Sequence, residues 1–376
     1  MPDALYIGLM SGTSADGIDA ALVQCGTEGQ PAQLIATREL PLPAELKAEI
    51  TALSHSGPQE IERLGVIDRE LGQAFAGAVN SLLAASPYSA KDIRAIGSHG
   101  QTLRHRPPSA GNPVAFTLQA GDPNTIAELT GITVVADFRR RDIAAGGEGA
   151  PLAPAFHAAA FAKSGVNRAI VNIGGIANIT LLRGEELVSG YDTGPGNTLL
   201  DYWVLRHEGR SYDKDGAWSA EGTPNEQLVT DLLADEYFAR VGPRSTGKEA
   251  FNPGWLDQHL PSSDSLDARD VQATLAELTA RSIARAIIDA EVSVDEVYIC
   301  GGGARNTDLM RRLYQHLEGI QLDDTAALGI APEWVEAAAF AWLAHQTLEE
   351  MAGNAPVVTG ARGERILGGI FPAGPS

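Results

Sequence analysis

Apolar residues recur along the chain with two spacings, and the places where the spacing changes mark the expected elements. Short apolar runs bounded by glycine, which are typical of buried strands, cover residues 5–9, 18–25, 93–98, 168–173, 176–182, 187–191 and 296–300. Apolar residues three and four positions apart predict helices over residues 59–86, 197–207, 226–239, 268–291 and 332–351, with one more from residue 306. Strands alternate with helices, so the pattern predicts an α/β protein.

One arrangement of these elements occurs twice in the chain. A strand, a polar glycine turn and a second strand cover residues 5–25, and the same order returns at residues 168–182. We therefore predict one fold used twice, with an N-terminal lobe over residues 1–131 and a C-terminal lobe over residues 132–354. The boundary follows the loop GDPNTIAELTG, after which new strand residues begin at Thr133. We expect the tail, from about residue 355 to residue 376, to pack back on the first lobe.

Composition and charge narrow the possible functions. The 376 residues are 44% hydrophobic and 20% charged, as in a globular protein long enough for two cores. The formal net charge of -20 disfavours binding to nucleic acid, which needs clustered lysine and arginine. The two cysteines, Cys25 and Cys300, fit a reducing compartment and are expected to be small buried apolar residues. No window has the roughly 18 apolar residues of a membrane span, so we expect a cytoplasmic protein with no membrane partner.

The first glycine turn lies in GLMSGTSADGID, residues 8–19. Glycine lets backbone N–H groups face a polyphosphate, hydroxyl groups add donors, and the Asp16 carboxylate could hold Mg²⁺ directly or through water. An ordinary hairpin turn is the alternative, because Asp-Gly is a common turn pair. The chain has no GxxxxGK[ST] motif of the Walker type. The residues expected to bind ATP here are Gly12, Thr13, Ser14, Ala15, Asp16, Gly17, Ile18 and Asp19.

The second and third glycine turns follow later strands. NIGGIANI (172–179) and YDTGPGN (191–197) place Asp192 beside a glycine-rich turn, where a carboxylate could act as a general base near a phosphate. A helix-capping or turn aspartate is the alternative. CGGGARNT (300–307) allows close approach of the backbone to a ligand. The residues expected to bind ATP in these turns are Gly174, Gly175, Gly194, Gly196, Asn197, Gly301, Gly302, Gly303 and Asn306.

The order of these turns resembles the two phosphate segments and the adenosine segment of the acetate and sugar kinase, Hsp70 and actin superfamily. The resemblance becomes closer with several longer blocks, and together they are similar to the signature of the anhydro-N-acetylmuramic acid kinase family. The blocks are GLMSGTSADGID, GSHGQTLRHRP, DFRRRDIAAGGEGAPLAP, NIGGIANI, YDTGPGN, CGGGARN and EAAAFAWLA, which span residues 8 to 344, and the ending VTGARGERILGGIFP.

This resemblance implies two duplicated actin-like lobes, with the ribonuclease H-like fold, around a central nucleotide cleft that holds ATP and Mg²⁺. It implies an ATP-dependent sugar kinase that converts 1,6-anhydro-N-acetylmuramic acid, ATP and water into N-acetylmuramic acid 6-phosphate and ADP. Such an enzyme serves peptidoglycan recycling and amino-sugar metabolism. A homodimer is also what the resemblance implies.

The resemblance also assigns roles to single residues. Asp192 matches the catalytic aspartate of the family, and Glu336 matches a second active-site carboxylate, with Glu333 as a rival by sequence alone. A guanidinium group offers a fork of donors to the lactyl carboxylate of the sugar, so we expect Arg139 or Arg141 to bind it. The further residues expected to line the sugar site are His99, Gln101 and Asn172.

Two departures from the family pattern and two other functions stay open at this point. Ala15 and Glu148 stand where the family more often has a larger apolar residue and a glutamine. Asn172 and Asn178 flank the second hairpin, and either could be a turn residue that bonds its own backbone instead of a site residue; His105 is interpreted as a loop residue. An actin-fold kinase for another sugar would use Asp192 to deprotonate a hydroxyl group. A nucleotide-dependent switch protein would show little turnover stimulated by sugar.

Overall fold

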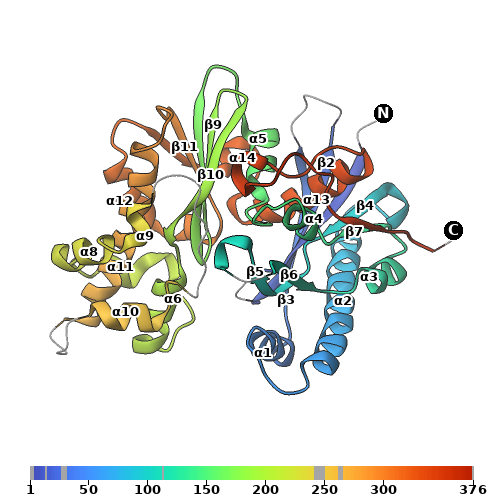
Figure 1. The fold of residues 1–376 in the computed structure, drawn as a ribbon, viewed down its shortest axis with the longest axis horizontal. Coiled ribbons are helices and arrows are strands. Elements are labelled where there is room, and N and C mark those ends of the chain that lie inside the picture. Colours follow the sequence, from blue (N-terminus) through green and yellow to red (C-terminus); the bar gives the residue numbers. More distant parts are fainter. Residues whose placement is uncertain are drawn as a thin grey trace. The chain divides into compact units, whose positions relative to one another are not determined.

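The chain forms two compact units in the computed structural model, which describes residues 4–12, 15–26, 32–111, 114–240, 250–260 and 266–374. Unit 1 comprises residues 1–161 and 334–376, and unit 2 comprises residues 162–333. Each unit has its own mixed sheet (Figure 1). Each unit also has its own cluster of buried apolar side chains. None of the helices in the described part of the chain has the length and apolar character that crossing a bilayer requires.

The sheet of unit 1 has six strands in the order β13-β7-β4-β1-β2-β3. β1, β2 and β3 form an antiparallel meander, whereas β4 and β7 continue the sheet parallel to β1. β13, near the C-terminus, pairs antiparallel with β7. The strands are β1 (Ala4–Met10), β2 (Gly17–Cys25), β3 (Gln33–Pro41), β4 (Ile93–Ser98), β7 (Val134–Ala136) and β13 (Gly369–Phe371).

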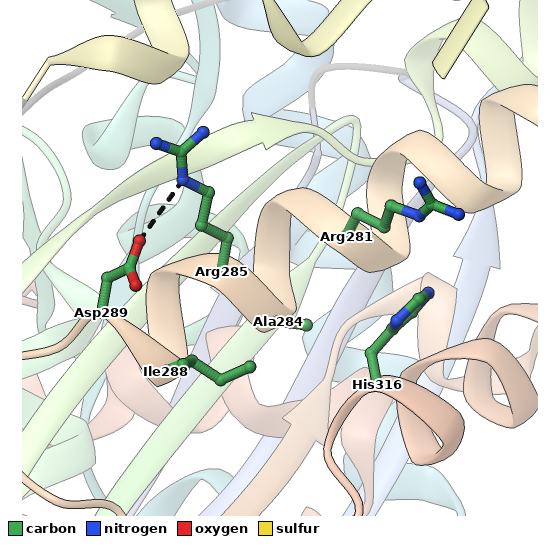
Figure 2. Close-up of a pocket in the computed structure, with 6 residues that line it drawn as sticks. All are labelled: Arg281, Ala284, Arg285, Ile288, Asp289 and His316. Atoms are coloured by element: carbon green, nitrogen blue, oxygen red, sulfur yellow. Dashed lines mark hydrogen bonds and ion pairs between the residues drawn. The ribbon is translucent and has the colours of Figure 1, made fainter. Parts of the chain in front are cut away.

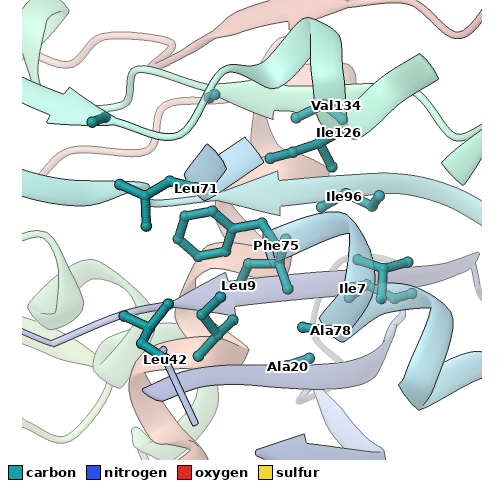
Figure 3. Close-up of a cluster of buried hydrophobic side chains, with 14 of the residues drawn as sticks. Ile7, Leu9, Ala20, Leu42, Leu71, Phe75, Ala78, Ile96, Ile126 and Val134 are labelled. Carbon is teal, nitrogen blue, oxygen red and sulfur yellow. The ribbon is translucent and has the colours of Figure 1, made fainter. Parts of the chain in front are cut away.

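Helices cover both faces of this sheet. α1 (Ala44–Leu53), α2 (Glu60–Ala84) and α3 (Pro123–Thr130) share one buried cluster with alternate residues of the strands. Figure 3 shows Leu71 and Phe75 of α2 among the strand residues Leu9 and Ile96. α13 (Val335–Leu348) packs on β1, β2 and β4. Because side chains alternate along a strand, Gly8 and Gly97 face the side opposite to Leu9 and Ile96.

The two glycines bring α13 into direct backbone contact with the sheet. A Cβ atom on Gly8 would lie 1.8 Å from the carbonyl oxygen of Ala337, and one on Gly97 would lie 1.9 Å from that of Phe340. Any side chain at either position would therefore displace the helix. This close packing fixes the first turn of α13 beside the segment that follows β4.

The sheet of unit 2 repeats the central part of the first sheet. Its order is β10-β9-β8-β11-β12, with β8, β9 and β10 antiparallel and β11 and β12 parallel to β8. The β3-β2-β1-β4-β7 strands of unit 1 have the same order and directions, so the predicted duplicated actin-like fold is confirmed. The strands are β8 (Asn167–Ile173), β9 (Ile176–Arg183), β10 (Glu186–Pro195), β11 (Glu296–Cys300) and β12 (Gln321–Asp324).

The helices of unit 2 form two groups. α11 (Ala268–Ile288) and α12 (Thr307–His316) contribute to the cluster that contains the sheet, and α11 also packs in a second cluster with the helices between β10 and α11. Those helices are α6 (Thr198–Glu208), α7 (Ala217–Ala220), α8 (Glu226–Leu233), α9 (Glu236–Ala239) and α10 (Pro253–His259). Short elements of unit 1 complete the fold: β5 (Gln101–Arg106), β6 (Phe116–Ala120), α4 (Arg140–Ala144), α5 (Ala153–Phe161) and α14 (Pro356–Thr359).

The units divide at other places than the expected boundary at residues 131 and 132. Residues 132–161 belong to unit 1, because β7 pairs with β4 and completes the first sheet. The chain returns to unit 1 at Trp334, because α13 packs on β1 and β4. Both contacts join residues that are far apart in the sequence, so the local pattern of apolar residues could not predict them.

Several local predictions also change. The helix expected over residues 226–239 breaks at Asp235, whose carboxylate accepts a hydrogen bond from the N–H of Tyr237 and starts α9. The strand expected to end at residue 191 continues to Pro195, so Asp192 lies within β10. His105 lies in β5 and not in a loop. Cys25 and Cys300 are buried thiols outside any disulfide, as predicted.

Candidate functional site

Two side chains donate hydrogen bonds to backbone carbonyl oxygens on either side of the turn between β1 and β2. The Ser11 hydroxyl donates to the carbonyl oxygen of Gly17 at 2.9 Å, and the side-chain amide of Gln101 donates to that of Gly12 at 3.2 Å. The Asp16 carboxylate is exposed and forms an ion pair with Lys47. Thr13 and Ser14 lie outside the residues that the structure describes.

Two residues that were predicted to belong to this turn, Ile18 and Asp19, lie in β2. Ile18 is 1% exposed and belongs to the core cluster of unit 1. Asp19 lies in β2, opposite Met10. The turn itself therefore ends at Gly17, and a phosphate contact from Ile18 could come only from its backbone.

A cluster of polar side chains lies where β4 ends. His99 is buried, and its Nε2 atom lies 3.0 Å from Nε and 2.9 Å from Nη2 of Arg139. A guanidinium group only donates, so His99 Nε2 must be the unprotonated nitrogen and Nδ1 must carry the proton. His99 Nδ1 is a buried donor that lies near the backbone of Gly100 but has no well-aligned hydrogen-bond partner among the described residues.

Glu336 of α13 belongs to the same cluster. It lies in the first turn of α13, one helical turn before Phe340, whose ring lies 4.7 Å from the His99 ring between centroids. Burial raises the pKa of the Glu336 carboxyl above its ordinary value, and the positive charge of Arg139 opposes this rise. Arg139 and Glu336 are thus electrostatically coupled across two elements that are distant in the sequence.

The charge states in this cluster follow from burial. Burial and the neighbouring guanidinium hold the pKa of His99 well below 6.5, so the imidazole is neutral at pH 7. Burial lowers the pKa of Arg139 to about 10, and the carboxylates of Glu336 and Asp142 oppose this change. Arg139 therefore stays cationic at neutral pH. The cluster offers a cation, a neutral N–H donor and a carboxylate to a small polar ligand.

The residues of the two alternative pairs have different surroundings. Arg139 contacts His99, whereas Arg141 is exposed on α4. Arg139 opposes the rise in the pKa of Glu336, whereas Glu333 pairs with Arg305 at 2.8 Å.

Asp192 lies in a row of polar residues across three strands of unit 2. Asp192 of β10 is opposite Asn178 of β9, and Asn178 is opposite Asn172 of β8. Residues directly opposite each other have Cβ atoms about 4.5–5.5 Å apart and point to the same face. Asp192 is 8% and Asn172 is 7% exposed, and the Oδ1 atoms of both asparagines are buried without a hydrogen-bond partner in the described structure.

Backbone contacts join the glycine turns beside this row. The N–H groups of Gly196 and Asn197 donate to the carbonyl oxygens of Gly175 and Gly174, at 2.9 and 2.8 Å. The Asn197 side-chain amide donates to the carbonyl oxygen of Ile173 at 3.2 Å. These groups hold the 174–175 turn against the start of α6.

The 301–303 turn packs against the end of β8. A Cβ atom on Gly301, whose φ is +79°, would lie 2.2 Å from Oδ1 of Asn172, and one on Gly303 would lie 2.3 Å from the Ile173 side chain. The Asn306 carboxamide oxygen accepts a hydrogen bond from Leu309 and caps α12. The turns at 174–175 and 301–303 therefore meet at the end of β8, next to Asn172.

Figure 2 shows a surface hollow elsewhere in unit 2, lined by Arg281, Ala284, Arg285, Ile288, Asp289 and His316. Its charged groups already have protein partners: Arg281 and His316 bind Glu277, and Arg285 binds Asp289. None of the predicted site residues lines it. The described residues also contain no group of three or more His, Cys, Asp or Glu side chains suited to a metal.

Comparison with known proteins identifies the family. The family described as anhydro-N-acetylmuramic acid kinase (AnmK) matches residues 4–373. A relative from Shewanella sp. (strain MR-7), named anhydro-N-acetylmuramic acid kinase, is 53% identical over 374 residues, 99% of this chain and 100% of its own. A relative of the same name from Pseudomonas putida is 50% identical over 98% of this chain and 100% of its own. This chain belongs to the anhydro-N-acetylmuramic acid kinase family.

Solved structures give more distant similarities. The activator of the 2-hydroxyisocaproyl-CoA dehydratase from Clostridium difficile, with bound ADPNP, has a TM-score of 0.46 at 14% identity, covering 92% of this chain and 96% of its own. A ROK family glucokinase from Streptomyces griseus, in complex with glucose and AMPPNP, has a TM-score of 0.38 at 15% identity, covering 91% and 100%. Membership of the anhydro-N-acetylmuramic acid kinase family rests on the full-length relatives.

The sequence did not predict the contacts of several residues near the candidate site. The Phe340 ring packs against the His99 ring, and Lys47 forms an ion pair with Asp16. Asn172 and Asn178, for which a turn role was left open, lie in β8 and β9, and Asn178 lies between Asn172 and Asp192. The alternation of polar and apolar residues in NIGGIANI could have indicated that Asn172 and Asn178 share a face.

Proposed function

We propose that this chain is an ATP-dependent kinase that hydrolyses the anhydro bond of 1,6-anhydro-N-acetylmuramic acid and phosphorylates the released O6. The products are N-acetylmuramic acid 6-phosphate and ADP. The observation that carries the proposal is the row of Asp192, Asn178 and Asn172 beside two glycine turns, in a chain that belongs to this family over its full length.

The chemistry requires a general base. The anhydro bridge joins O6 to C1, so the substrate has no free 6-hydroxyl group. Asp192 takes a proton from water while the water oxygen attacks C1, and the C1–O6 bond breaks. O6 attacks the γ-phosphorus, the bond to the β-phosphate oxygen breaks, and ADP leaves. Asp192 is buried, and its cross-strand neighbour is Asn178.

The cluster in unit 1 binds the sugar in this proposal. Arg139 offers its guanidinium to the lactyl carboxylate, because a planar fork of donors matches two carboxylate oxygens. The His99 Nδ1 donor and the Gln101 Oε1 acceptor have no well-aligned hydrogen-bond partner among the described residues and suit the hydroxyl and acetamido groups. Glu336 orients the sugar or the water in this proposal.

The glycine turns bind ATP in this proposal, with contacts from Gly12, Gly174 and Gly301 and their neighbours. Mg²⁺ prefers oxygen ligands and keeps several waters. The buried Oδ1 atoms of Asn172 and Asn178 beside Asp192 fit that preference. Asp16, the ligand predicted first, would have to exchange its ion pair with Lys47 for the metal. Bound Mg²⁺ would neutralise charge on the transferring phosphoryl group.

The cellular setting is proposed on the same basis. A chain with two buried cysteines outside any disulfide, related over its full length to these kinases, suits a cytoplasmic role in peptidoglycan recycling. A homodimer is part of the proposal by family resemblance alone. Gel filtration coupled to light scattering would test it, with a monomer mass of 39.5 kDa as the contradicting result.

The test of the function is ADP release with different sugars. ADP should form with 1,6-anhydro-N-acetylmuramic acid, and the product should be the 6-phosphate. ADP release only with N-acetylmuramic acid or N-acetylglucosamine, which have a free 6-hydroxyl group, would favour a kinase for another sugar. ADP release that no sugar stimulates would favour the switch protein.

The titration of Glu336 is expected to determine the acid limb of the profile of kcat/KM against pH. Its pKa is raised by burial, so its carboxylate is lost at a higher pH than an ordinary glutamate as the solution is acidified. We expect kcat/KM of the wild type to fall as pH decreases through this raised pKa. The Glu336→Gln variant should have a lower kcat/KM, and its profile should lose this limb. An unchanged limb in the variant would assign the titration to another group.

A substitution in the third glycine turn, at Gly301, is expected to weaken ATP binding. In Gly301→Ala, the new methyl group would collide with Oδ1 of Asn172 and the residue would need a φ of +79°. We expect the KM for ATP to rise about tenfold or more, as for about 1.4 kcal/mol or more of strain. Gly319→Ala is a control, because it also has positive φ but no atom within 4 Å of its Cβ position. An equal KM for ATP in both variants would contradict this role.

A further inference from the structure

The fully buried carboxylate of Asp142 connects two parts of unit 1. One is the C-terminal segment, residues 354–374, and the other is the loop of residues 146–149 that follows α4. Asp142 is 0% exposed and accepts three hydrogen bonds from other parts of unit 1. The donors are the N–H of Gly149 at 2.8 Å, Nδ2 of Asn354 at 2.7 Å and Oγ1 of Thr359 at 2.8 Å. Charge-assisted bonds of this kind are stronger than neutral ones, so Asp142 ties the two segments together firmly.

The glycines of the GGEG block fit around this carboxylate. A Cβ atom on Gly147 would lie 2.2 Å from Oδ2 of Asp142, and Gly149 has a φ of +70°. The C-terminal segment also binds the loop through its backbone, because the N–H of Glu148 donates to the carbonyl oxygen of Thr359 at 2.8 Å. The loop conformation therefore depends on both Asp142 and the C-terminal segment.

The same loop holds the guanidinium of Arg139. The Gly149 carbonyl oxygen accepts a hydrogen bond from Nη1 of Arg139 at 2.8 Å, while Nε and Nη2 face His99. The guanidinium is planar and rigid, so contacts on two of its sides fix the orientation of the whole group. Gly149 thus forms hydrogen bonds with both residues: its N–H donates to Asp142, and its carbonyl oxygen accepts from Arg139.

We propose that Asp142, held by Asn354 and Thr359, is a positioning residue for sugar binding, because it fixes the 146–149 loop and through Gly149 sets the orientation of the Arg139 guanidinium. This inference rests on the proposed role of Arg139 at the sugar carboxylate. The C-terminal segment acts in this way on the orientation of Arg139 through Asp142 and Gly149.

The test compares two threonine variants of the full chain. Thr359→Val removes the hydroxyl that donates to Asp142. Thr347→Val is the matched control, since its buried hydroxyl also contacts the C-terminal segment, donating to the carbonyl oxygens of Leu343 and Leu367, but has no contact with Asp142. We expect Thr359→Val to raise the KM for 1,6-anhydro-N-acetylmuramic acid about threefold to tenfold, as for the loss of a single hydrogen bond to a charged group. The KM for ATP should stay unchanged, and the control should show neither effect.

Hydrogen exchange gives a readout that does not depend on activity. The peptide that contains residues 146–149 should exchange faster in Thr359→Val than in Thr347→Val. Equal KM values for the sugar in the two variants, with an active wild type, would overturn the positioning role alone. A wild type that releases no ADP in response to the sugar would instead overturn the proposed function, and the sugar role of Arg139 with it.

Discussion

Replacing Asp192 with asparagine is expected to lower kcat by about 100-fold to 10,000-fold, which is the usual contribution of a general base. Asparagine has the size of aspartate and can keep the place in the row with Asn178 and Asn172, but it cannot accept the proton that water must lose. The KM for ATP should change little, because the glycine turns hold the nucleotide. Single-turnover and steady-state rates of ADP release would measure both quantities.

Asp267→Asn is the matched control for this variant. It makes the same change of charge in the same unit, but at the exposed N-cap of α11, where the Asp267 carboxylate accepts a hydrogen bond from Arg269. Asparagine caps helices about as well as aspartate, so the control should retain wild-type turnover. A turnover in Asp192→Asn within about threefold of the control would remove Asp192 from the role of base.

The substitution Gly97→Ala is expected to destabilise unit 1 by about 3 kcal/mol or more, at the upper end of the overpacking range. The new Cβ atom would lie 1.9 Å from the carbonyl oxygen of Phe340, and a backbone atom within a helix cannot turn aside as a flexible side chain can. α13 would have to move away from β4, and it would carry Glu336 and Phe340 with it. Activity should therefore fall together with stability.

Gly77→Ala provides the comparison for Gly97. Gly77 is exposed in the middle of α2, and no atom lies within 4 Å of its Cβ position. Alanine is favoured over glycine within a helix, so this control should be neutral or more stable by about 0.5–1 kcal/mol. Urea unfolding of both variants, followed by the fluorescence of tryptophan, would measure the difference. Equal midpoints would show that α13 does not pack directly against β4.

The sequence was sufficient for those features that depend on neighbouring residues. The glycine-bounded hairpins at 5–25 and 168–182 each form a local strand pair, and the apolar period of residues 59–86 predicts α2 closely. Asp192 was predicted as the base because its motif is contiguous, and Glu336 was predicted from the resemblance of EAAAFAWLA to the family block; both roles stay predictions.

Features that depend on distant contacts could not be predicted in this way. The contact between Arg139 and His99 joins two different blocks of the sequence, so the sequence alone offered no reason to prefer Arg139 to Arg141. Asp142 stood within a run of arginines and gave no sign of being buried. Its donors Asn354 and Thr359 are 212 and 217 positions away along the chain. The boundary between the units was predicted at the wrong residues for the same reason, because the packing of α13 on the first sheet cannot be recognised from neighbouring residues.

The most direct test of the hydrolytic kinase reaction is the position of ¹⁸O after turnover in labelled water. The enzyme would convert 1,6-anhydro-N-acetylmuramic acid with ATP in H₂¹⁸O, and mass spectrometry of the 6-phosphate would locate the label. Unlabelled product kept in the same water for the same time corrects for exchange at C1. The mechanism predicts one ¹⁸O at C1 and none in the phosphoryl group. Label in the phosphoryl group, or a C1 oxygen labelled no more than the exchange control, would contradict it.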